Sequence, residues 1–351
     1  MSKILVTGGC GYIGSHTIID LIENGFDVIS ADNNSRSNPV ILKGVEQITG
    51  KKIKNYKVNL CNFDDIFAVF QENTDIRGII HFAAYKSVGE SVRFPLMYFE
   101  NNLTSLINLL KCVQEFQIPY FVFSSSCTVY GNPDEIPVTE TTAPKPAQSP
   151  YGYTKQMSEQ IVNEFAKSSG TQCILLRYFN PAGAHPSSII GEMPIGAPQN
   201  LVPAITQTAI GRIPKMLVHG NDYPTRDGSC IRDYVHVCDL ASAHTLSLKY
   251  LEEGKNTGLC EVFNLGTGNG VSVLEAIHAF EKISGVKLNY EIGPRREGDV
   301  IAVYANNDMA KNLLGWKINF SLENIMETAW KWELRLKADE TVFRSQPGEL
   351  N

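Results

Sequence analysis

The chain has 351 residues, 43% hydrophobic and 19% charged, which is typical of a globular protein with one large domain or two smaller ones. Its net charge of −6 provides no basic surface for nucleic acid or an anionic membrane. No apolar run approaches the roughly 20 residues needed to span a bilayer, and the apolar start is too short for a signal peptide.

The eight cysteines are scattered, with no C-x-x-C pair and no tight cluster with histidine. This pattern favours reduced thiols over a disulfide framework or a zinc site. We therefore expect a soluble cytoplasmic protein without a metal.

The first half of the chain alternates apolar, β-rich runs with amphipathic stretches. Strands are expected at residues 3–8, 26–32, 55–60, 77–84, 120–126 and 173–180. Helices are expected at 12–25, 63–72, 95–117 and 150–168. Nearly continuous apolar strands separated by helices predict an α/β fold, with a Rossmann-type doubly wound parallel sheet covered on both faces. Residues 1–180 are expected to form this larger domain.

The amino-acid composition changes after Asn180: residues 181–200 are rich in Pro and Gly, which indicates a loop. Helices are then expected at 201–211, 238–252, 272–284 and 321–337, with short strands at 215–220, 232–237 and 261–266. We expect residues 181–351 to form a smaller α/β domain that completes a cleft. Its boundary is soft, because some segments are expected to return to the large sheet.

The sequence "TGGCGYIG" (7–14) follows the first strand and opens the first helix. Gly8, Gly11 and Gly14 provide a tight turn and a close backbone approach to a pyrophosphate, which then faces the helix N-terminus. Asp32 ends the second strand, where a carboxylate can accept hydrogen bonds from the ribose hydroxyls and repel a 2′-phosphate. Asp32 therefore favours NAD over NADP, although Arg36 could favour NADP. The context of strand, glycine loop and helix also favours a cofactor site over a glycine turn without a ligand.

The sequence "SPYGYTK" (149–155) places Tyr151 and Lys155 four residues apart, on one helix face. Tyr153 should point away. Tyrosine has a pKa near 10, so a base at neutral pH needs help from a cation or a positive nicotinamide. Ser126 ends a strand at the edge where ligands gather. A Tyr-x-x-x-Lys match is common by chance, but together with the glycine loop it predicts a nicotinamide enzyme that acts on a carbinol.

These residues resemble the extended, nucleotide-sugar branch of the short-chain dehydrogenase/reductase superfamily. The match narrows to the UDP-glucose 4-epimerase (UDP-galactose 4-epimerase) family, in one register from about residue 3 to 335, through "VTGGCGYIGSHT", "VGESV", "FSSSCTVYG", "SPYGYTK", "LLRYFNPAGAHPS", "NLVP", "GNDYPTRDGSCIRDYVHVCDLA", "NLGTGNG" and "PRREGD".

The resemblance implies an isomerase that reversibly epimerises UDP-glucose and UDP-galactose at C4. Tyr151 would take the 4-hydroxyl proton through Ser126 while hydride passes to a tightly bound NAD. The 4-keto sugar would then turn over, and hydride would return to its other face. Homodimers are common in the family, often through helices that correspond to 95–117 and 150–168.

Site residues carry over by position. Ser126, Tyr151 and Lys155 are the catalytic set. The cofactor set is Gly8, Gly11, Tyr12, Ile13, Gly14, Asp32, Asn33, Asn59, Leu60, Phe82, Ala83, Lys86, Asn101, Ser126, Tyr151, Lys155 and Tyr178. The UDP-sugar set is Lys86, Ser126, Tyr151, Asn180, Asn200, Leu201, Arg232, Tyr234, Arg295, Asp299 and Val303. His81 and Cys127 are expected to be ordinary buried residues.

Two positions depart from the family pattern. Asn59 replaces the usual acidic residue on the adenine side, and we expect cofactor binding to be retained. Val303 takes the position that gates sugar size, where tyrosine fills the space beside C2 and a small residue admits an N-acetyl group. We hypothesise that UDP-GlcNAc and UDP-GalNAc are also accepted.

Two other functions compete with epimerisation. Nucleotide-sugar 4,6-dehydratases and decarboxylases of the same branch typically carry acidic residues after the strand-end Ser or Thr, where this chain has Cys127 and Thr128. A non-catalytic NAD-binding sensor would usually lack the Tyr–Lys pair, which this chain has.

Overall fold

A computed structural model describes residues 2–296 and 300–339. Seven parallel strands form the main sheet, in the order β11-β6-β5-β4-β1-β2-β3. The predicted doubly wound Rossmann-type fold is confirmed. The strands are β1 (Lys3–Thr7), β2 (Asp27–Ala31), β3 (Asn55–Tyr56), β4 (Ile76–His81), β5 (Tyr120–Ser126), β6 (Gln172–Tyr178) and β11 (Cys260–Leu265).

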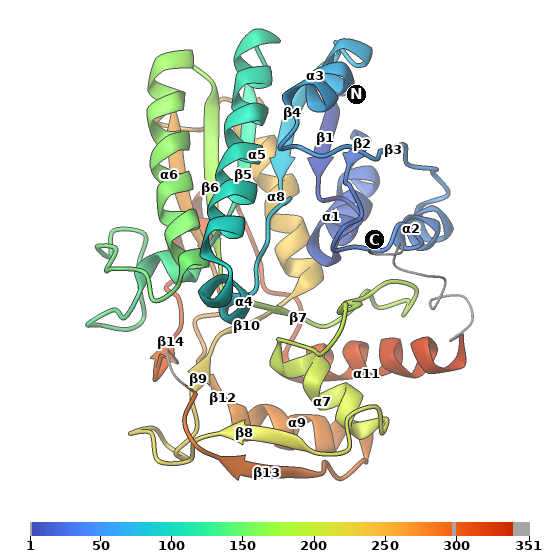
Figure 1. The fold of residues 1–351 in the computed structure, drawn as a ribbon, viewed down its shortest axis with the longest axis vertical. Helices are drawn as coiled ribbons and strands as arrows, with labels where there is room; N and C mark the ends of the chain where they lie inside the picture. The colour runs from blue at the N-terminus through green and yellow to red at the C-terminus, as the bar shows by residue number, and fades with distance from the viewer. Residues whose placement is uncertain (1, 297–299, 340–351) are drawn as a thin grey trace.

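Helices cover both faces of this sheet (Figure 1). One layer holds α1 (Tyr12–Glu23), α2 (Ile41–Thr49) and α8 (Val237–Glu252), and the other holds α3 (Phe63–Glu72), α5 (Pro95–Glu115) and α6 (Pro150–Ser169). Side chains of β1 alternate between the layers: Ile4 and Val6 belong to one apolar core, and Leu5 belongs to the other. Both faces of the sheet are therefore buried, which explains why its central strands are apolar along their length.

A smaller part lies below the sheet in Figure 1 and has its own apolar core. Its helices are α7 (Leu201–Ala209), α9 (Val273–Ser284) and α11 (Leu322–Ala338). Its short strands pair as β7 (Asn180–Ala182) with β10 (Tyr234–His236), β8 (Met216–His219) with β13 (Tyr290–Gly293), and β9 (Ile231–Arg232) with β12 (Val271–Ser272) and β14 (Ala302–Val303).

After residue 180 the chain serves both parts, because α8 and β11 rejoin the large sheet. The division of the chain at residue 180 stays a prediction. Some local details differ from expectation: β3 covers only Asn55–Tyr56 of the predicted 55–60, and the helices α2, α4 (Val88–Arg93) and α10 (Asp308–Leu313) were not predicted. Among the described residues, no helix is long and apolar enough to cross a membrane.

Candidate active site

The glycine loop between β1 and α1 leaves no room for side chains. A Cβ on Gly14 would lie 2.3 Å from the Gly8 carbonyl oxygen, and Gly8 itself has φ 71° and lies against the backbone of Ala83. Gly11 is the N-cap of α1, so no side chain caps the first turn. A cradle of bare backbone at an uncapped helix N-terminus fits the pyrophosphate of a dinucleotide.

Asp32 lies at the end of β2 and holds this loop in place. Its carboxylate accepts hydrogen bonds from the backbone N–H of Cys10 (3.1 Å) and Asn34 (2.8 Å) and from the Ser37 hydroxyl (2.9 Å). Burial raises the pKa of Asp32, and these hydrogen bonds oppose that rise. Arg36 is directed elsewhere, because its guanidinium pairs with Glu90 at 2.9 Å. The pairing weakens the case for a 2′-phosphate contact.

Other predicted cofactor residues lie on α1, α5 and β6 and in the loops that follow β2, β3 and β4. Tyr12 donates to the Gly183 carbonyl at 2.6 Å and so connects α1 to the loop after β7. Asn59 accepts from Cys61 N–H at 3.1 Å, in a local turn, while Asn101 donates to Asn102 at 3.0 Å. Ile13 of α1 packs against the core, Leu60 is buried, and Asn33 accepts a hydrogen bond from Ser35 N–H. Ala83 follows β4, and the rings of Phe82 and Tyr178 both contact His244.

Ser126, Tyr151 and Lys155 come together where β5 ends and α6 begins. Ser149 caps α6 by accepting from Gly152 N–H, and Pro150 occupies its first position, so Tyr151 lies in the first turn. Burial raises the pKa of Tyr151, and a hydrogen bond with Ser126 opposes part of that rise. The Lys155 ammonium lies 6.0 Å from the Tyr151 ring centroid, while Tyr153 is exposed as expected.

Burial dominates the ionisation of both groups. It raises the pKa of Tyr151 to about 12, against the hydrogen bond from Ser126. It lowers the pKa of Lys155 to about 8, against the carboxylate of Glu159. The Lys155 ammonium donates to the Ser124 carbonyl at 2.5 Å and lies over the Phe123 ring. The expected lowering of the Tyr151 pKa is therefore not achieved by these protein groups alone.

A buried ion pair fixes α6 against the sheet. Arg177 of β6 makes two hydrogen bonds to the carboxylate of Glu159, at 2.9 and 2.7 Å, and Ser125 donates to the same carboxylate. Arg177 also donates to the Tyr130 hydroxyl at 3.0 Å. Glu159 is one turn along the helix from Lys155, so this pair sets the height of the catalytic residues above the strand ends.

Four predicted substrate residues line one small cavity of about 20 Å³: Asn180, Asn200, Leu201 and Tyr234. Arg232 donates to the backbone carbonyls of Ile231 and Val300. Val303 is buried on β14 and is the register partner of Arg232. Arg295 pairs with Asp222 at 2.8 Å at the surface. Asp299 lies outside the described residues.

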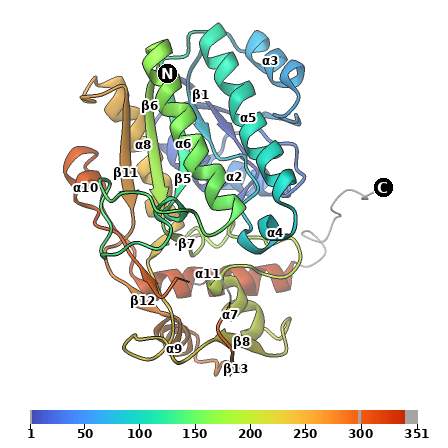
Figure 2. The ribbon, with the colours of Figure 1, turned by 60° about the vertical axis from the view of Figure 1, so that its left-hand side comes forward.

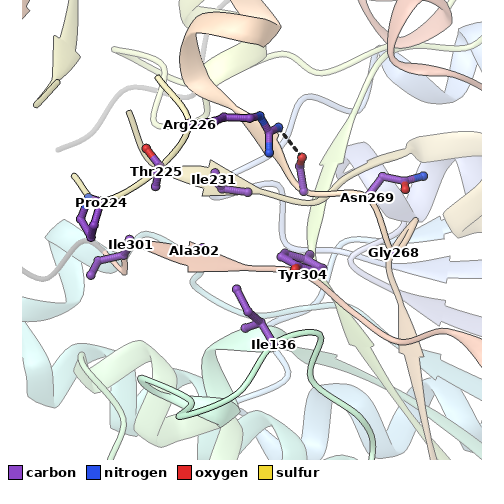
Figure 3. Close-up of a pocket in the computed structure, with 11 residues that line it drawn as sticks. Ile136, Pro224, Thr225, Arg226, Ile231, Gly268, Asn269, Ile301, Ala302 and Tyr304 are labelled. Atoms are coloured by element: carbon purple, nitrogen blue, oxygen red, sulfur yellow. Dashed lines mark hydrogen bonds between the residues drawn. The ribbon is translucent and has the colours of Figure 1, made fainter. Parts of the chain in front are cut away.

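A larger cavity, of about 430 Å³, lies on the other face of β9 and β14 (Figure 3). Ile231 and Ala302 line it together with Arg226 and Tyr304. Adjacent strand residues point to opposite faces, so Arg232 and Val303 are directed away from this cavity. None of the predicted site residues in the described part of the chain lines it.

One residue of this region was missed from the sequence. Glu192 accepts a hydrogen bond from Asn200 and pairs with Lys86, two residues of the predicted site. A sequence signal existed, because Glu192 is the only Asp, Glu, Lys or Arg in the loop at 181–200.

Comparison with known proteins gives the family. The chain is 46% identical over 331 residues to a UDP-glucose 4-epimerase of Bacillus subtilis (strain 168), a match that covers 94% of this chain and 96% of that protein. The chain belongs to the UDP-glucose 4-epimerase family. The epimerase of Drosophila melanogaster is 45% identical over 337 residues, covering 94% of this chain and 96% of that one.

Solved structures of epimerases agree with this family. The UDP-glucose 4-epimerase from Bifidobacterium longum, in complex with NAD+ and UDP, superposes with a TM-score of 0.91 at 43% identity, covering 95% of this chain and 98% of that one. The epimerase from Stenotrophomonas maltophila, with bound NAD and formylated UDP-arabinopyranose, gives a TM-score of 0.92 at 42% identity, covering 96% and 99%.

A family model described as GDP-mannose 4,6 dehydratase matches residues 5–329. The site distinguishes the two chemistries. Cys127 and Thr128, which follow Ser126, carry no carboxylate, and burial raises the pKa of the Cys127 thiol to about 11. These positions therefore lack the base that a dehydratase of this branch typically has.

Proposed function

We propose that this chain interconverts UDP-glucose and UDP-galactose by epimerisation at C4 with a tightly bound NAD. The observation that carries the proposal is the convergence of Ser126, Tyr151 and Lys155 at the end of β5, on the same edge of the parallel sheet as the bare glycine loop that follows β1. The backbone of that loop, with Asp32 and Lys86, would hold the cofactor. Asn180, Asn200, Leu201 and Tyr234 would hold the UDP-sugar, together with Arg232 and Arg295.

The chain supplies the proton chemistry. As phenolate, Tyr151 accepts the proton of the sugar 4-hydroxyl, and Ser126 hydrogen-bonds both oxygens during the transfer. NAD, held by the glycine loop with Asp32 and Lys86, would supply hydride transfer from and to C4 of the sugar. Tyr151 then gives the proton back, so the reaction involves no net oxidation.

A panel of four UDP-sugars followed by product NMR tests the reaction, with UDP-glucose and UDP-galactose as the decisive pair. Tyr151→Phe should lower kcat by about 10²–10⁴-fold, because only the proton carrier is removed. Tyr153→Phe is the matched control, since Tyr153 lies on the exposed face of the same helix and should leave kcat unchanged. Full activity of Tyr151→Phe would overturn the assignment of the base. A 4-keto-6-deoxy product would indicate a dehydratase, and no turnover would indicate a sensor.

A second candidate activity is the epimerisation of UDP-GlcNAc and UDP-GalNAc. Val303 supports it, because the side chain is small, is 7% exposed and packs with Val129, Tyr130 and Phe179. Val303→Tyr should abolish turnover of UDP-GalNAc and retain that of UDP-galactose, because a phenol ring would fill the space beside C2. Lack of any UDP-GlcNAc product from UDP-GalNAc with the native chain would contradict this activity.

We also infer a homodimer that forms through α5 and α6, which lie side by side in Figure 2. Large apolar side chains are exposed on these helices, namely Leu96, Ile107, Tyr153 and Met157. Exposed apolar side chains on two adjacent helices are typical of an interface. The cytoplasmic location stays a prediction; all eight cysteines are free in the structure, as a reducing compartment requires.

A further inference from the structure

Glu192 lies in the loop between β7 and α7, on backbone that is fixed by α11. Its carbonyl accepts a hydrogen bond from Trp332 Nε1 at 2.9 Å. The preceding Gly191 forms a bridge with Ala184, and a Cβ there would lie 2.5 Å from the Trp332 ring. The carboxylate of Glu192 is therefore presented from a rigid support.

The Glu192 side chain is 12% exposed, and its carboxylate faces residues of both predicted subsites. It accepts a hydrogen bond from Asn200 Nδ2 at 2.8 Å, and the Lys86 ammonium lies 3.5 Å away. Burial is the main cause that raises the pKa of Tyr12, and the negative charge of Glu192 is the second. One carboxylate thus faces a cofactor residue of α1, a substrate residue at α7 and Lys86, which is predicted to serve both.

Asn200 is the N-cap residue of α7, and this makes its contact with Glu192 informative. An Asn at this position commonly accepts from the second or third N–H of the helix. Pro203 is the third residue and has no N–H, so only the N–H of Val202 could be capped in this way. Within the described chain, Asn200 makes no such cap bond, and its amide is held by Glu192 instead.

The first turn of α7 is consequently left open towards the small cavity, which Leu201 and Val202 line together with Asn180. The Asn180 Oδ1 atom is buried and has no hydrogen-bond partner among the described residues. Uncapped N–H groups at a helix N-terminus attract phosphate.

We propose that Glu192 is a positioning residue for the UDP diphosphate: it holds the Asn200 side chain away from α7, so that the N–H groups of the first turn stay free for the phosphates. The proposal rests on the proposed function of this site. Without Glu192, the Asn200 side chain turns to cap Val202 and competes with the diphosphate. Lys86 offsets the negative charge that Glu192 brings near the anion.

Titration calorimetry with UDP, on the enzyme as purified with its cofactor, tests this role. Glu192→Ala should weaken UDP binding by about five- to tenfold, since a helix cap of typical strength then competes. Glu192→Gln keeps an acceptor for Asn200 and should bind UDP within about twofold of the native chain. Glu164→Gln, which removes a carboxylate from an exposed ion pair with Lys167, is the matched control and should change nothing.

A double-mutant cycle with Asn200→Ala separates this role from general structural damage. Once Asn200 has no amide, Glu192→Ala should cause no further loss of UDP affinity, because no side chain remains to cap α7. An equal loss in both backgrounds would overturn the proposal, as would native affinity of Glu192→Ala. If Glu192→Ala unfolds, Glu192→Met keeps the volume and should show the same loss. Failure of the native chain to bind UDP would instead remove the proposed function.

Discussion

Lys155 is a cation held away from water, and its proton couples stability to pH. Burial lowers its pKa to about 8, whereas in the unfolded chain a lysine keeps its proton up to about 10.4. Between these values the unfolded chain binds more protons, so the contribution of Lys155 to stability rises with pH. Below pH 8 the buried charge destabilises the fold by its full amount.

Lys155→Met should therefore stabilise the protein at pH 7 while lowering kcat. The gain should be on the order of 1–2 kcal/mol, because the lost hydrogen bond to Ser124 offsets part of the relieved desolvation. Urea midpoints of both proteins at pH 7 and pH 10 measure it. The difference should shrink at pH 10, where the native lysine is neutral; a difference that is independent of pH would contradict this account.

For single residues, the sequence was sufficient to predict the position of a side chain wherever a general structural rule applies. The strand-end rule and helix spacing predicted that Ser126, Tyr151 and Lys155 meet, and that Tyr153 points outward. The sequence could not predict the direction in which the Tyr151 pKa shifts. Burial raises this pKa and a nearby cation lowers it, and the extent of burial is known only from the tertiary structure. Glu192 was missed for the same reason, since its partners Lys86 and Asn200 are distant in sequence.

Among the elements, α6 depends most on a single buried interaction, the pair between Glu159 and Arg177. Arg177→Met should destabilise the protein by about 3–5 kcal/mol, because it leaves the carboxylate of Glu159 buried and uncompensated. Denaturant unfolding at pH 7 measures the loss. Changing both residues to Met should recover most of it. If the double variant is as unstable as Arg177→Met, the loss does not come from the uncompensated carboxylate of Glu159, and this explanation is wrong.

The elements that could be predicted are those whose burial is complete. The central strands of the large sheet, β1, β4 and β5, are buried on both faces and have apolar sequences, so their positions followed from the sequence. Helix α2 buries only Ile41 and Val45 along its nine residues, and no side chain caps its start. The segment 57–60 was predicted to continue β3, but on this side of β2 only Asn55 and Tyr56 pair with it.

For the whole molecule, the exposed face of α5 and α6 predicts the oligomeric state. Met157→Glu combined with Ile107→Glu should convert the protein to a monomer, because charges in an apolar interface are costly to desolvate. Sedimentation velocity measures the change. Leu313→Glu, at an exposed position of α10 (Asp308–Leu313), is the control and should remain dimeric. A native chain that sediments as a monomer would refute the dimer.

The return of the chain to its large sheet has a consequence for synthesis. Cys173 of β6 pairs with Cys260 of β11, a separation of 87 residues along the chain. Until residue 265 has left the ribosome, the outer edge of β6 has no neighbour and can pair with other strands. Closing so long a loop is slow, and an open edge invites aggregation. The nascent chain is therefore most prone to aggregation in the interval between the synthesis of β6 and that of residue 265.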